Sequence, residues 1–326
     1  MNDVFLQKGE AGVLSKEFAE YINWLKKLNR PPLNTLSIEY ARTINKFIRE
    51  YLTDKNCDLK FKNIDNKIIK TQNFQIPIRI YYPVNYNRES PTIFYFHGGG
   101  WILCNLDTHD SFCKKLSFHS EFVVISVDYS LSPEAKFPKA LNELTELLIW
   151  FQNNHKELNI LNNKTIIGGD SAGGNLAASL ILKARDLNLN SIKAQVLIYP
   201  ALDFNNKNYD SYKKYSNGYL LDNEQIIWFE ENYLTNKTDG LNHFASPINA
   251  DDLSNLPKTC ILTAEFDPIR DNGEVYAEKL SEFSTDVSCI RYNGMVHGFF
   301  LYDGIFKQII DPIILELATI VKKLNT

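Results

Sequence analysis

Apolar positions in residues 1–55 recur at the spacing of amphipathic helices. Between residues 14 and 28 they fall every three or four positions, at Leu14, Phe18, Tyr21, Ile22 and Leu25. A second stretch repeats the pattern at Tyr40, Ile44, Phe47, Ile48 and Tyr51. Side chains three and four apart share one helix face, so both stretches predict helices, separated by Pro31-Pro32.

From residue 59 onward the pattern becomes that of strands. KFKNIDNKIIKT (60–71) and FQIPIRIYYP (74–83) read as two antiparallel strands joined by a polar turn. Short apolar runs follow: TIFYF (92–96), FVVISV (122–127), TIIG (165–168), QVLIY (195–199), CILTA (260–264) and VSCIRY (287–292). They alternate with helical segments near 137–155, 171–187, 271–283 and 308–324. Buried parallel strands need helical crossovers, so this order predicts a mostly parallel α/β sheet.

The segment from about 203 to 250 is too long for an ordinary connection between two strands. It is rich in Tyr, Asn and Lys, and its pattern predicts a helix from Asn223 to Tyr233. We expect this segment to form part of a lid over the strand ends.

Composition excludes several classes of protein. The chain has 326 residues, of which 44% are hydrophobic, and its net charge of −4 argues against a nucleic-acid partner. No apolar run has the length of a membrane helix, and no secretory signal is expected because Asp3, Lys8 and Glu10 interrupt the N-terminus. Five widely spaced cysteines without a CxxC motif indicate reduced thiols, which favours a cytoplasmic location.

Four strand ends carry residues that are suited to catalysis. Gly169, Ser171 and Gly173 form a G-x-S-x-G motif after the TIIG run, typical of a sharp strand-to-helix turn with Ser at its apex. HGGG (97–100) follows TIFYF, and consecutive glycines let backbone N–H groups turn toward a ligand. Asp267 and His297 follow two later apolar runs, which gives the chain order Ser, Asp, His.

In combination, these stretches resemble the hormone-sensitive-lipase-like carboxylesterases of the α/β-hydrolase fold. The resemblance rests on HGGGW (97–101), LDTHDSFCKKLS (106–117), VDYSLSPE (127–134), GGDSAGGNLAA (168–178), LPKTCILTAEFDPIRDNGEVYAEKL (256–280) and VHGFF (296–300). It implies Ser171 as nucleophile, Asp267 as acid and His297 as base. It also implies an oxyanion hole of amides from Gly99, Gly100 and Ala172, with Gly98 in the same loop.

Some residues depart from the family pattern or allow another interpretation. The family often has Gly at Cys104, Arg at Ser130 and Ala at Ser132. Cys104, His109, Cys113 and His119 fall close together, but structural zinc usually shows tighter cysteine pairs, so we favour a packed helix over a metal. The charged side chains of Asp170 and Glu265 either anchor loops by hydrogen bonds or lie at the surface.

The expected fold is one α/β-hydrolase domain with an eight-stranded sheet whose second strand is antiparallel. Residues 56–326 form its core, and residues 1–55 together with about 203–250 form a helical cap. The expected function is hydrolysis of small to medium acyl esters without a cofactor or metal. An amidase or deacetylase, a lipase and a non-catalytic receptor remain alternatives. The expected partner is a small-molecule ester, with a homodimer left open.

Aromatic residues predicted in the cap favour a small pocket. Six of them are candidates to close over it: Tyr21, Trp24, Tyr215, Tyr219, Trp228 and Phe229. Burying each further CH₂ is worth about 0.8 kcal/mol only while room remains. The sequence therefore predicts a preference for acyl chains of roughly two to eight carbons.

Overall fold

The computed structural model of the chain describes residues 4–160, 164–189, 191–205 and 207–325, and within them one nine-stranded sheet. Its strands are β1 (Phe5–Lys8), β2 (Phe61–Lys70), β3 (Gln75–Pro83), β4 (Thr92–Phe96), β5 (Val123–Val127), β6 (Thr165–Asp170), β7 (Ile192–Ile198), β8 (Lys258–Phe266) and β9 (Val287–Val296). Their order across the sheet is β1-β9-β8-β7-β6-β4-β5-β3-β2. β3 runs antiparallel to both of its neighbours, and the other pairs are parallel.

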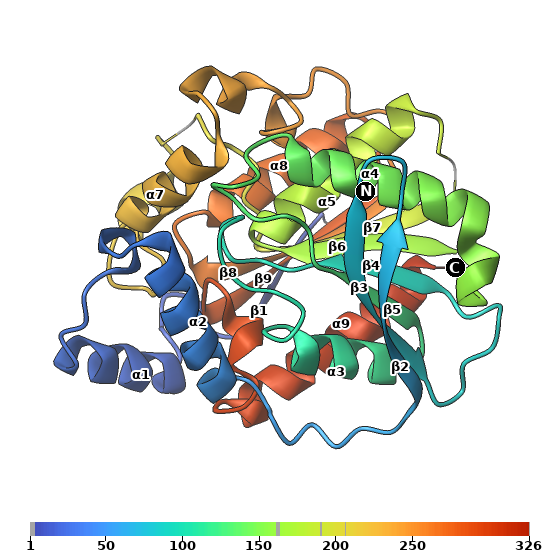
Figure 1. Cartoon of the computed structure of the whole chain (residues 1–326). Coiled ribbons are helices and arrows are strands. Elements are labelled where there is room, and N and C mark those ends of the chain that lie inside the picture. The colour runs from blue at the N-terminus through green and yellow to red at the C-terminus, as the bar shows by residue number, and fades with distance from the viewer. Residues whose placement is uncertain (1–3, 161–163, 190, 206, 326) are drawn as a thin grey trace.

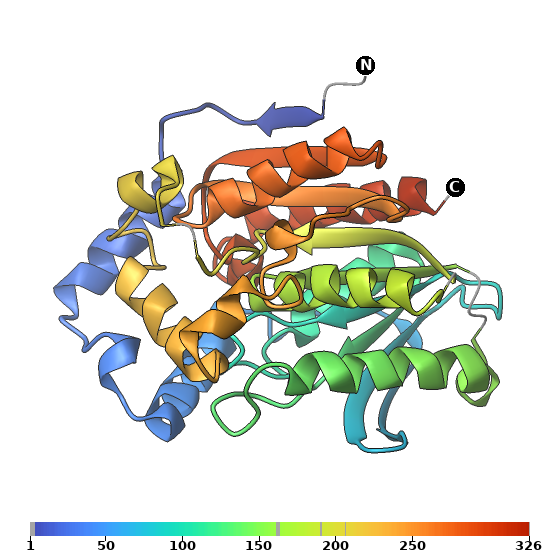
Figure 2. The same ribbon diagram turned by 90° about the horizontal axis from the view of Figure 1, so that it is seen from above.

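Helices cover both faces of the sheet and one of its ends (Figures 1 and 2). The α-helices are α1 (Lys16–Lys27), α2 (Ile38–Leu52), α3 (Asp110–Ser120), α4 (Lys139–Asn154), α5 (Ala172–Asp186), α6 (Asp210–Lys214), α7 (Asn223–Tyr233), α8 (Arg270–Glu282) and α9 (Lys307–Leu324). Short 3₁₀ helices span Leu33–Thr35, His155–Leu158, Lys237–Leu241, Pro247–Asn249 and Phe299–Tyr302. In Figure 1, α4, α5 and α8 lie on one face, α3 and α9 lie on the other, and α1, α2 and α7 gather at one end.

Strand β4 shows why the sheet needs helices on both faces. Its side chains alternate between two apolar clusters: Phe94 and Phe96 pack in the cluster that includes residues of α4 and α5, whereas Ile93 and Tyr95 pack in the one that includes α3 and α9. All four are at most 2% exposed. A strand buried on both faces reads as a continuous apolar run, which explains the TIFYF pattern.

The sheet has one strand more than the eight that the sequence predicted. Strand β1 lies in the segment expected to be wholly helical, and it pairs in parallel with β9 at the edge of the sheet. All four of its side chains are exposed, so no apolar alternation marks it in the sequence. Backbone pairing places this strand, and residues 1–55 therefore contribute to the core sheet as well as to the end of the molecule that carries α1 and α2.

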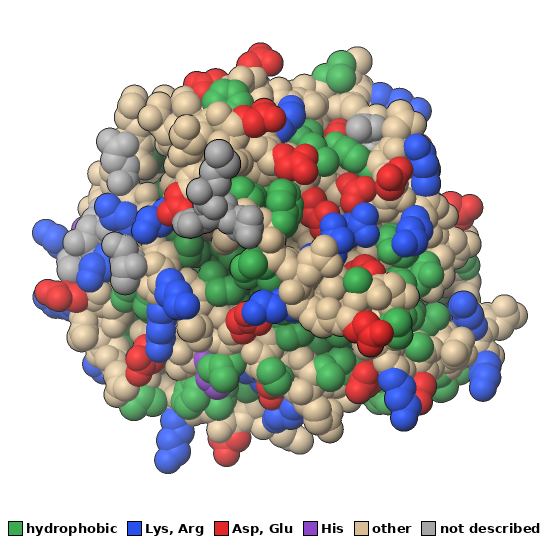
Figure 3. Space-filling view, turned by 180° about the vertical axis from the view of Figure 1, so that it is seen from behind, with side chains coloured by type: hydrophobic (Ala, Val, Ile, Leu, Met, Phe, Trp, Pro, Cys, Tyr) green, Lys and Arg blue, Asp and Glu red, His purple; other side chains and the backbone are tan. Residues whose placement is uncertain are grey.

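The surface shows mixed charge on the face opposite to that of Figure 1. In Figure 3, side chains of Lys and Arg lie among those of Asp and Glu, with apolar side chains between them. Across the parts of the chain that the structure describes, no helix combines the length and apolar character required to cross a bilayer.

A buried ion cluster joins α3 to the C-terminal part of the chain. Lys115 Nζ lies 2.8 Å from Asp303 Oδ2, 2.7 Å from Asp311 Oδ1 and 3.3 Å from Asp54 Oδ2. Lys115 is only 4% exposed. Because a buried charge is costly unless it is paired, this lysine is the counter-ion that makes burial of the Asp303 carboxylate tolerable.

Replacing Lys115 by Met should lower the free energy of unfolding by about 3 kcal/mol, because it leaves the buried carboxylate of Asp303 without its cation. The matched control is Lys114→Met, since Lys114 forms a more exposed pair with Asp110 at 2.7 Å. That change should cost less than about 1 kcal/mol. Urea unfolding followed by circular dichroism gives both values, and equal losses would contradict a stabilising role for the buried cluster.

Candidate active site

Ser171 stands at a strained turn between β6 and α5. Its backbone has φ 54° and ψ −117°, outside the regions that ordinary residues favour. The glycines of the motif permit this turn: a Cβ at Gly173 would lie 2.0 Å from the carbonyl oxygen of Phe96, and one at Gly169 would lie 2.4 Å from that of Gly173. The G-x-S-x-G spacing is thus a steric requirement of the turn.

Ser171, His297 and Asp267 meet in one chain of hydrogen bonds. His297 Nε2 lies 2.9 Å from Ser171 Oγ, and His297 Nδ1 lies 2.7 Å from Asp267 Oδ2. Asp267 is fully buried, and its other oxygen accepts the amide of Ile269 at 2.9 Å. When Nδ1 carries the proton, it donates to Asp267, and Nε2 is then free to accept the hydroxyl proton of Ser171. The ring of Tyr199 packs beside the imidazole, with centroids 4.8 Å apart.

The HGGG loop lies against this serine turn. Gly99 has φ 113°, and a Cβ there would lie 2.3 Å from the carbonyl oxygen of Leu103, so only glycine fits. Within the described residues, the amides of Gly99 and Gly100 have no internal acceptor. Ala172 is the first residue of α5, where an N–H has no partner within the helix.

Gly98 differs from the expectation for the oxyanion hole. Its amide donates to Asp170 Oδ1 at 2.9 Å and is therefore not available to a ligand. Gly98 anchors the loop instead. A side chain there would also overlap Asp170, because its Cβ would lie 2.4 Å from Oδ2.

Asp170 is an acidic residue that anchors loops at the site. It is 2% exposed and accepts hydrogen bonds from Tyr95 Oη at 2.8 Å and from the Gly98 amide. His109 Nε2 lies 3.2 Å from the same carboxylate. Burial by itself raises the pKa of Asp170, but His109 and Tyr95 outweigh it and bring the pKa below its usual value. The anchoring alternative stated for this residue is confirmed.

Glu265 anchors a different pair of segments. Its two carboxylate oxygens accept the amide of Gly12 at 2.7 Å and that of Gly294 at 2.9 Å. The side chain is buried, so it is also an anchor and not a surface charge. It ties the N-terminal segment to β9, the strand that leads to His297.

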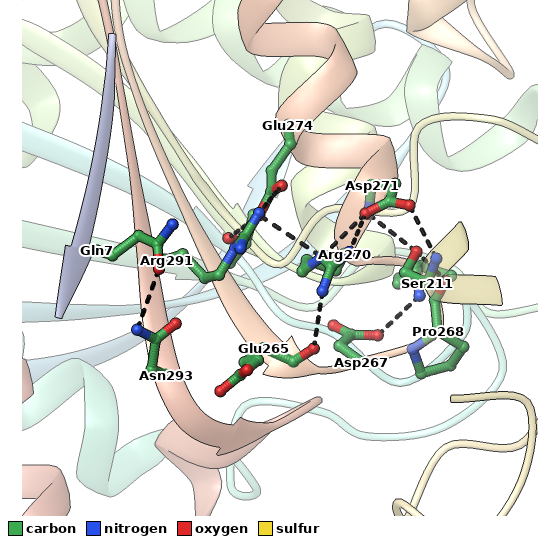
Figure 4. Close-up of polar contacts among 12 residues, drawn as sticks. Gln7, Ser211, Glu265, Asp267, Pro268, Arg270, Asp271, Glu274, Arg291 and Asn293 are labelled. Atoms are coloured by element: carbon green, nitrogen blue, oxygen red, sulfur yellow. Dashed lines mark hydrogen bonds and ion pairs between the residues drawn. The ribbon is translucent and has the colours of Figure 1, made fainter. Parts of the chain in front are cut away.

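Asp271 links the segment after β8 to the segment from about 203 to 250, which is called the inserted segment below (Figure 4). Its Oδ2 accepts the amide of Ser211 in α6 at 2.8 Å, and its Oδ1 lies 2.7 Å from Arg270 Nη2. Ser211 Oγ in turn donates to the Pro268 carbonyl at 2.9 Å. Helix α8 has Ile269 at its N-cap, so Asp271 lies in the first turn.

An open cavity of about 990 Å³, its mouth included, lies beside Ser171 and His297. Core loops supply Gly99, Gly100 and Trp101, α2 supplies Asn45 and Arg49, and the inserted segment supplies Leu220, Leu221, Gln225, Ile226, Phe229 and Glu230. Both segments expected to form a cap therefore reach this cavity.

The predicted aromatic lining of this cavity is largely wrong. Of the six aromatic residues, only Phe229 lines it, and the other lining aromatics are Trp101, Phe204 and Tyr302. Tyr215 and Tyr219 pack on Phe266 instead, with centroid distances of 5.3 and 5.4 Å. The helical pattern identifies apolar positions but does not say which of them pack inside the wall.

The departures from the family pattern have local explanations. Cys104 has φ 71°, a left-handed conformation that favours glycine, and its sulfur accepts from Asn45 Nδ2 at 3.4 Å. Ser130 donates from its amide and hydroxyl to Glu143, and Ser132 Oγ donates to the Ala135 carbonyl at 2.9 Å. In the described residues, no three side chains of His, Cys, Asp or Glu converge as a metal site requires.

Comparison with known proteins places this geometry in a family. A family model described as the alpha/beta hydrolase fold matches residues 93–301. An arylesterase of Saccharolobus solfataricus is 42% identical over 234 residues, which cover 71% of this chain and 75% of that protein. The carboxylesterase NlhH of Mycobacterium tuberculosis is 35% identical over 228 residues, 69% and 71% of the two chains. A hyperthermophilic esterase from Pyrobaculum calidifontis superposes with a TM-score of 0.88 at 33% identity, covering 96% and 99%.

The fold is therefore that of an α/β-hydrolase, and the protein is an enzyme of the serine ester hydrolase class. The chain belongs to the hormone-sensitive-lipase-like carboxylesterase family.

Proposed function

We propose that this enzyme hydrolyses esters of small to medium acyl groups through an acyl-enzyme on Ser171, with His297 as base and Asp267 as acid. The observation that supports it best is the chain of two hydrogen bonds from Ser171 through His297 to buried Asp267, at the wall of the cavity. A nucleophile, a base and a group that orients the base are the three parts that such chemistry needs.

In the first half of the proposed reaction, Ser171 Oγ attacks the acyl carbon while His297 Nε2 takes the hydroxyl proton. Asp267 holds the imidazole in the tautomer that leaves Nε2 free and stabilises its cation. The carbonyl oxygen becomes an oxyanion, which accepts hydrogen bonds from the amides of Gly99, Gly100 and Ala172. The C–O bond to the alcohol then breaks, and His297 returns the proton to the departing alcohol.

In the second half, water attacks the acyl carbon of the ester formed on Ser171. His297 accepts a proton from this water, and the same amides stabilise the second oxyanion. The bond to Ser171 Oγ breaks, the proton returns to Oγ, and a carboxylic acid leaves. Every group in this cycle ends in its starting state, so no co-reactant besides water is consumed.

The segments 1–55 and about 203–250 form the cap in this proposal. Their residues line the cavity over the reacting serine, and Phe229 packs on the oxyanion loop. A Cβ at Gly100 would lie 2.1 Å from Cδ1 of the Phe229 ring, which leaves no gap there. In this proposal, the contact narrows the cavity beside the oxyanion loop and limits the length of the acyl chain or alcohol that fits there.

Replacing Ser171 by Ala should lower turnover by at least about 10⁴-fold, because no acyl-enzyme can form. A serine-reactive phosphonate should label the wild-type protein at Ser171 and leave the variant unlabelled, as peptide mass mapping would show. Melting curves serve as the control for folding. Labelling of another residue would contradict the assignment.

Substitutions of three carboxylates near the site distinguish the acid that orients His297 from the residues that only anchor loops. Asp267→Asn should lower kcat by about 10³–10⁴-fold, because an amide does not hold the imidazole in the same tautomer. Asp271→Asn should mainly cost stability, about 1 kcal/mol, since its contacts are with Arg270 and Ser211. The loss of kcat in Glu265→Gln should lie between the losses in the Asp267 and Asp271 variants. Steady-state kinetics with melting curves decide, and an inactive Asp271 variant beside an active Asp267 variant would reverse the assignment.

A series of para-nitrophenyl esters from acetate to palmitate tests the size of the pocket. We expect kcat/KM to peak within about two to eight acyl carbons, because each CH₂ contributes about 0.8 kcal/mol only while room remains. Phe229→Ala, which opens the wall beside Gly100, should shift the peak to longer chains. Activity that rises steadily to palmitate in the wild-type enzyme is the result that this proposal does not allow.

A further inference from the structure

Arg49 is a half-buried cation with incomplete hydrogen bonding at the cavity. It projects from α2, one helical turn after Asn45, and both residues line the same cavity as Ser171 and His297. Its Nε and Nη1 atoms are buried and have no hydrogen-bond partner. Arg42 on the same helix differs, because it pairs with Glu134 at 2.8 Å.

The groups that interact with Arg49 satisfy it only in part. The Cζ of Arg49 lies 5.9 Å from the centroid of the Tyr302 ring, and the Tyr302 hydroxyl accepts a hydrogen bond from the guanidinium. Cys104, Tyr199 and the carboxylate of Asp170 interact with it electrostatically. Burial raises the pKa of Tyr302, Tyr199 and Cys104, so the two phenols and the thiol stay uncharged at neutral pH.

The acidic residues that line the cavity are already engaged elsewhere. Asp170 accepts from Tyr95 and Gly98, Glu230 pairs with Lys207, and Asp203 accepts from Tyr209 Oη at 2.8 Å. The residues lining this cavity are all described, and none of their carboxylates forms an ion pair with Arg49. A guanidinium whose N–H groups are shielded from water and lack partners lowers the stability of the fold unless an anion binds to it.

We propose that Arg49 binds a carboxylate on the substrate, so that the preferred substrates are esters that carry a second, negatively charged group. This inference rests on the proposed ester hydrolysis at Ser171. Arginine suits the role because its planar fork of N–H donors matches both oxygens of a carboxylate. The carboxylate lies either on the acyl part or on the alcohol part of the ester, and the experiment separates the two.

The test compares matched esters that differ only in a methyl group and a carboxylate. For the acyl side the pair is para-nitrophenyl pentanoate and mono-para-nitrophenyl glutarate. For the alcohol side it is para-tolyl acetate and para-carboxyphenyl acetate. The measured quantity is the ratio of kcat/KM for the charged ester to kcat/KM for the neutral one, so a general loss of activity in a variant cancels.

Arg49→Gln should lower this ratio by about 10- to 100-fold in one arm, the range of a charge-assisted hydrogen bond. The loss should fall mainly on KM, and Arg49→Lys should recover part of it. The matched control is Lys46→Gln, which removes a positive charge from the same helix at an exposed position outside this cavity. The control should leave the ratio within about threefold of the wild-type value, because exposed charges act weakly.

A purely structural role for Arg49 predicts a different result, because it would lower kcat/KM for charged and neutral esters alike. A ratio unchanged by Arg49→Gln in both arms therefore overturns the proposal. Equal falls in the Arg49 and Lys46 variants also overturn it, since they would reflect only long-range charge.

A binding measurement separates this proposal from the proposed function. Calorimetric titration of glutarate and of para-toluate should show binding of one of them to the wild-type protein and to the Ser171→Ala variant, with at least about tenfold weaker binding to Arg49→Gln. If the wild-type protein binds the carboxylate but hydrolyses no ester, the proposed chemistry is refuted and the anion site is kept. Turnover of neutral esters without any binding of either carboxylate would refute the anion site and keep the proposed chemistry.

Discussion

The structure of the site depends on the close packing of strands β4 and β6. Phe96 at the end of β4 pairs with Gly169 in β6, and its carbonyl oxygen occupies the space in which a Cβ of Gly173 would lie. This contact forces the positive φ of Ser171, because the chain has to turn sharply over a neighbouring backbone. It also brings the HGGG loop, which continues from β4, beside the serine. One steric constraint thus positions both the hydroxyl and the free amides of Gly99 and Gly100.

Buried and partly buried carboxylates hold the loops around this turn together. Asp170 joins the serine turn to the HGGG loop, Glu265 joins β9 to the N-terminal segment, and Asp271 joins α8 to α6. Each accepts backbone N–H groups, which is the arrangement that makes a buried negative charge tolerable. Because these contacts connect segments far apart in the sequence, a small shift of one strand end would disturb several loops at once. The geometry between Ser171 and His297 therefore depends on carboxylates that hold the surrounding segments together.

Local patterns in the sequence were sufficient to predict the sheet, the helices and the four strand ends that meet at Ser171. The G-x-S-x-G motif is readable because its glycines satisfy a short-range steric demand. Strand β1 was missed because its four side chains are exposed and only backbone bonds hold it. The lining of the cavity was mispredicted because it depends on how the segments carrying α2 and α7 pack, which helical periodicity does not encode. The left-handed Cys104 did leave a signal, since the family often has glycine there.

In the proposed function, the division between core and cap separates the reacting groups from the groups that surround a substrate. Ser171, Asp267 and His297 come from strand ends, whereas Asn45, Arg49 and Phe229 come from helices at one end of the sheet. A substitution at a cavity-lining position of α2 or α7 changes the wall of the cavity without removing the hydrogen bonds that join Ser171, His297 and Asp267. Such a wall tolerates a group that is costly for stability, because binding offsets the cost when the partner arrives. An incompletely bonded guanidinium in α2 is a group of this kind: an anion that satisfied it would also stabilise the docking of α2 on the Phe299–Tyr302 helix.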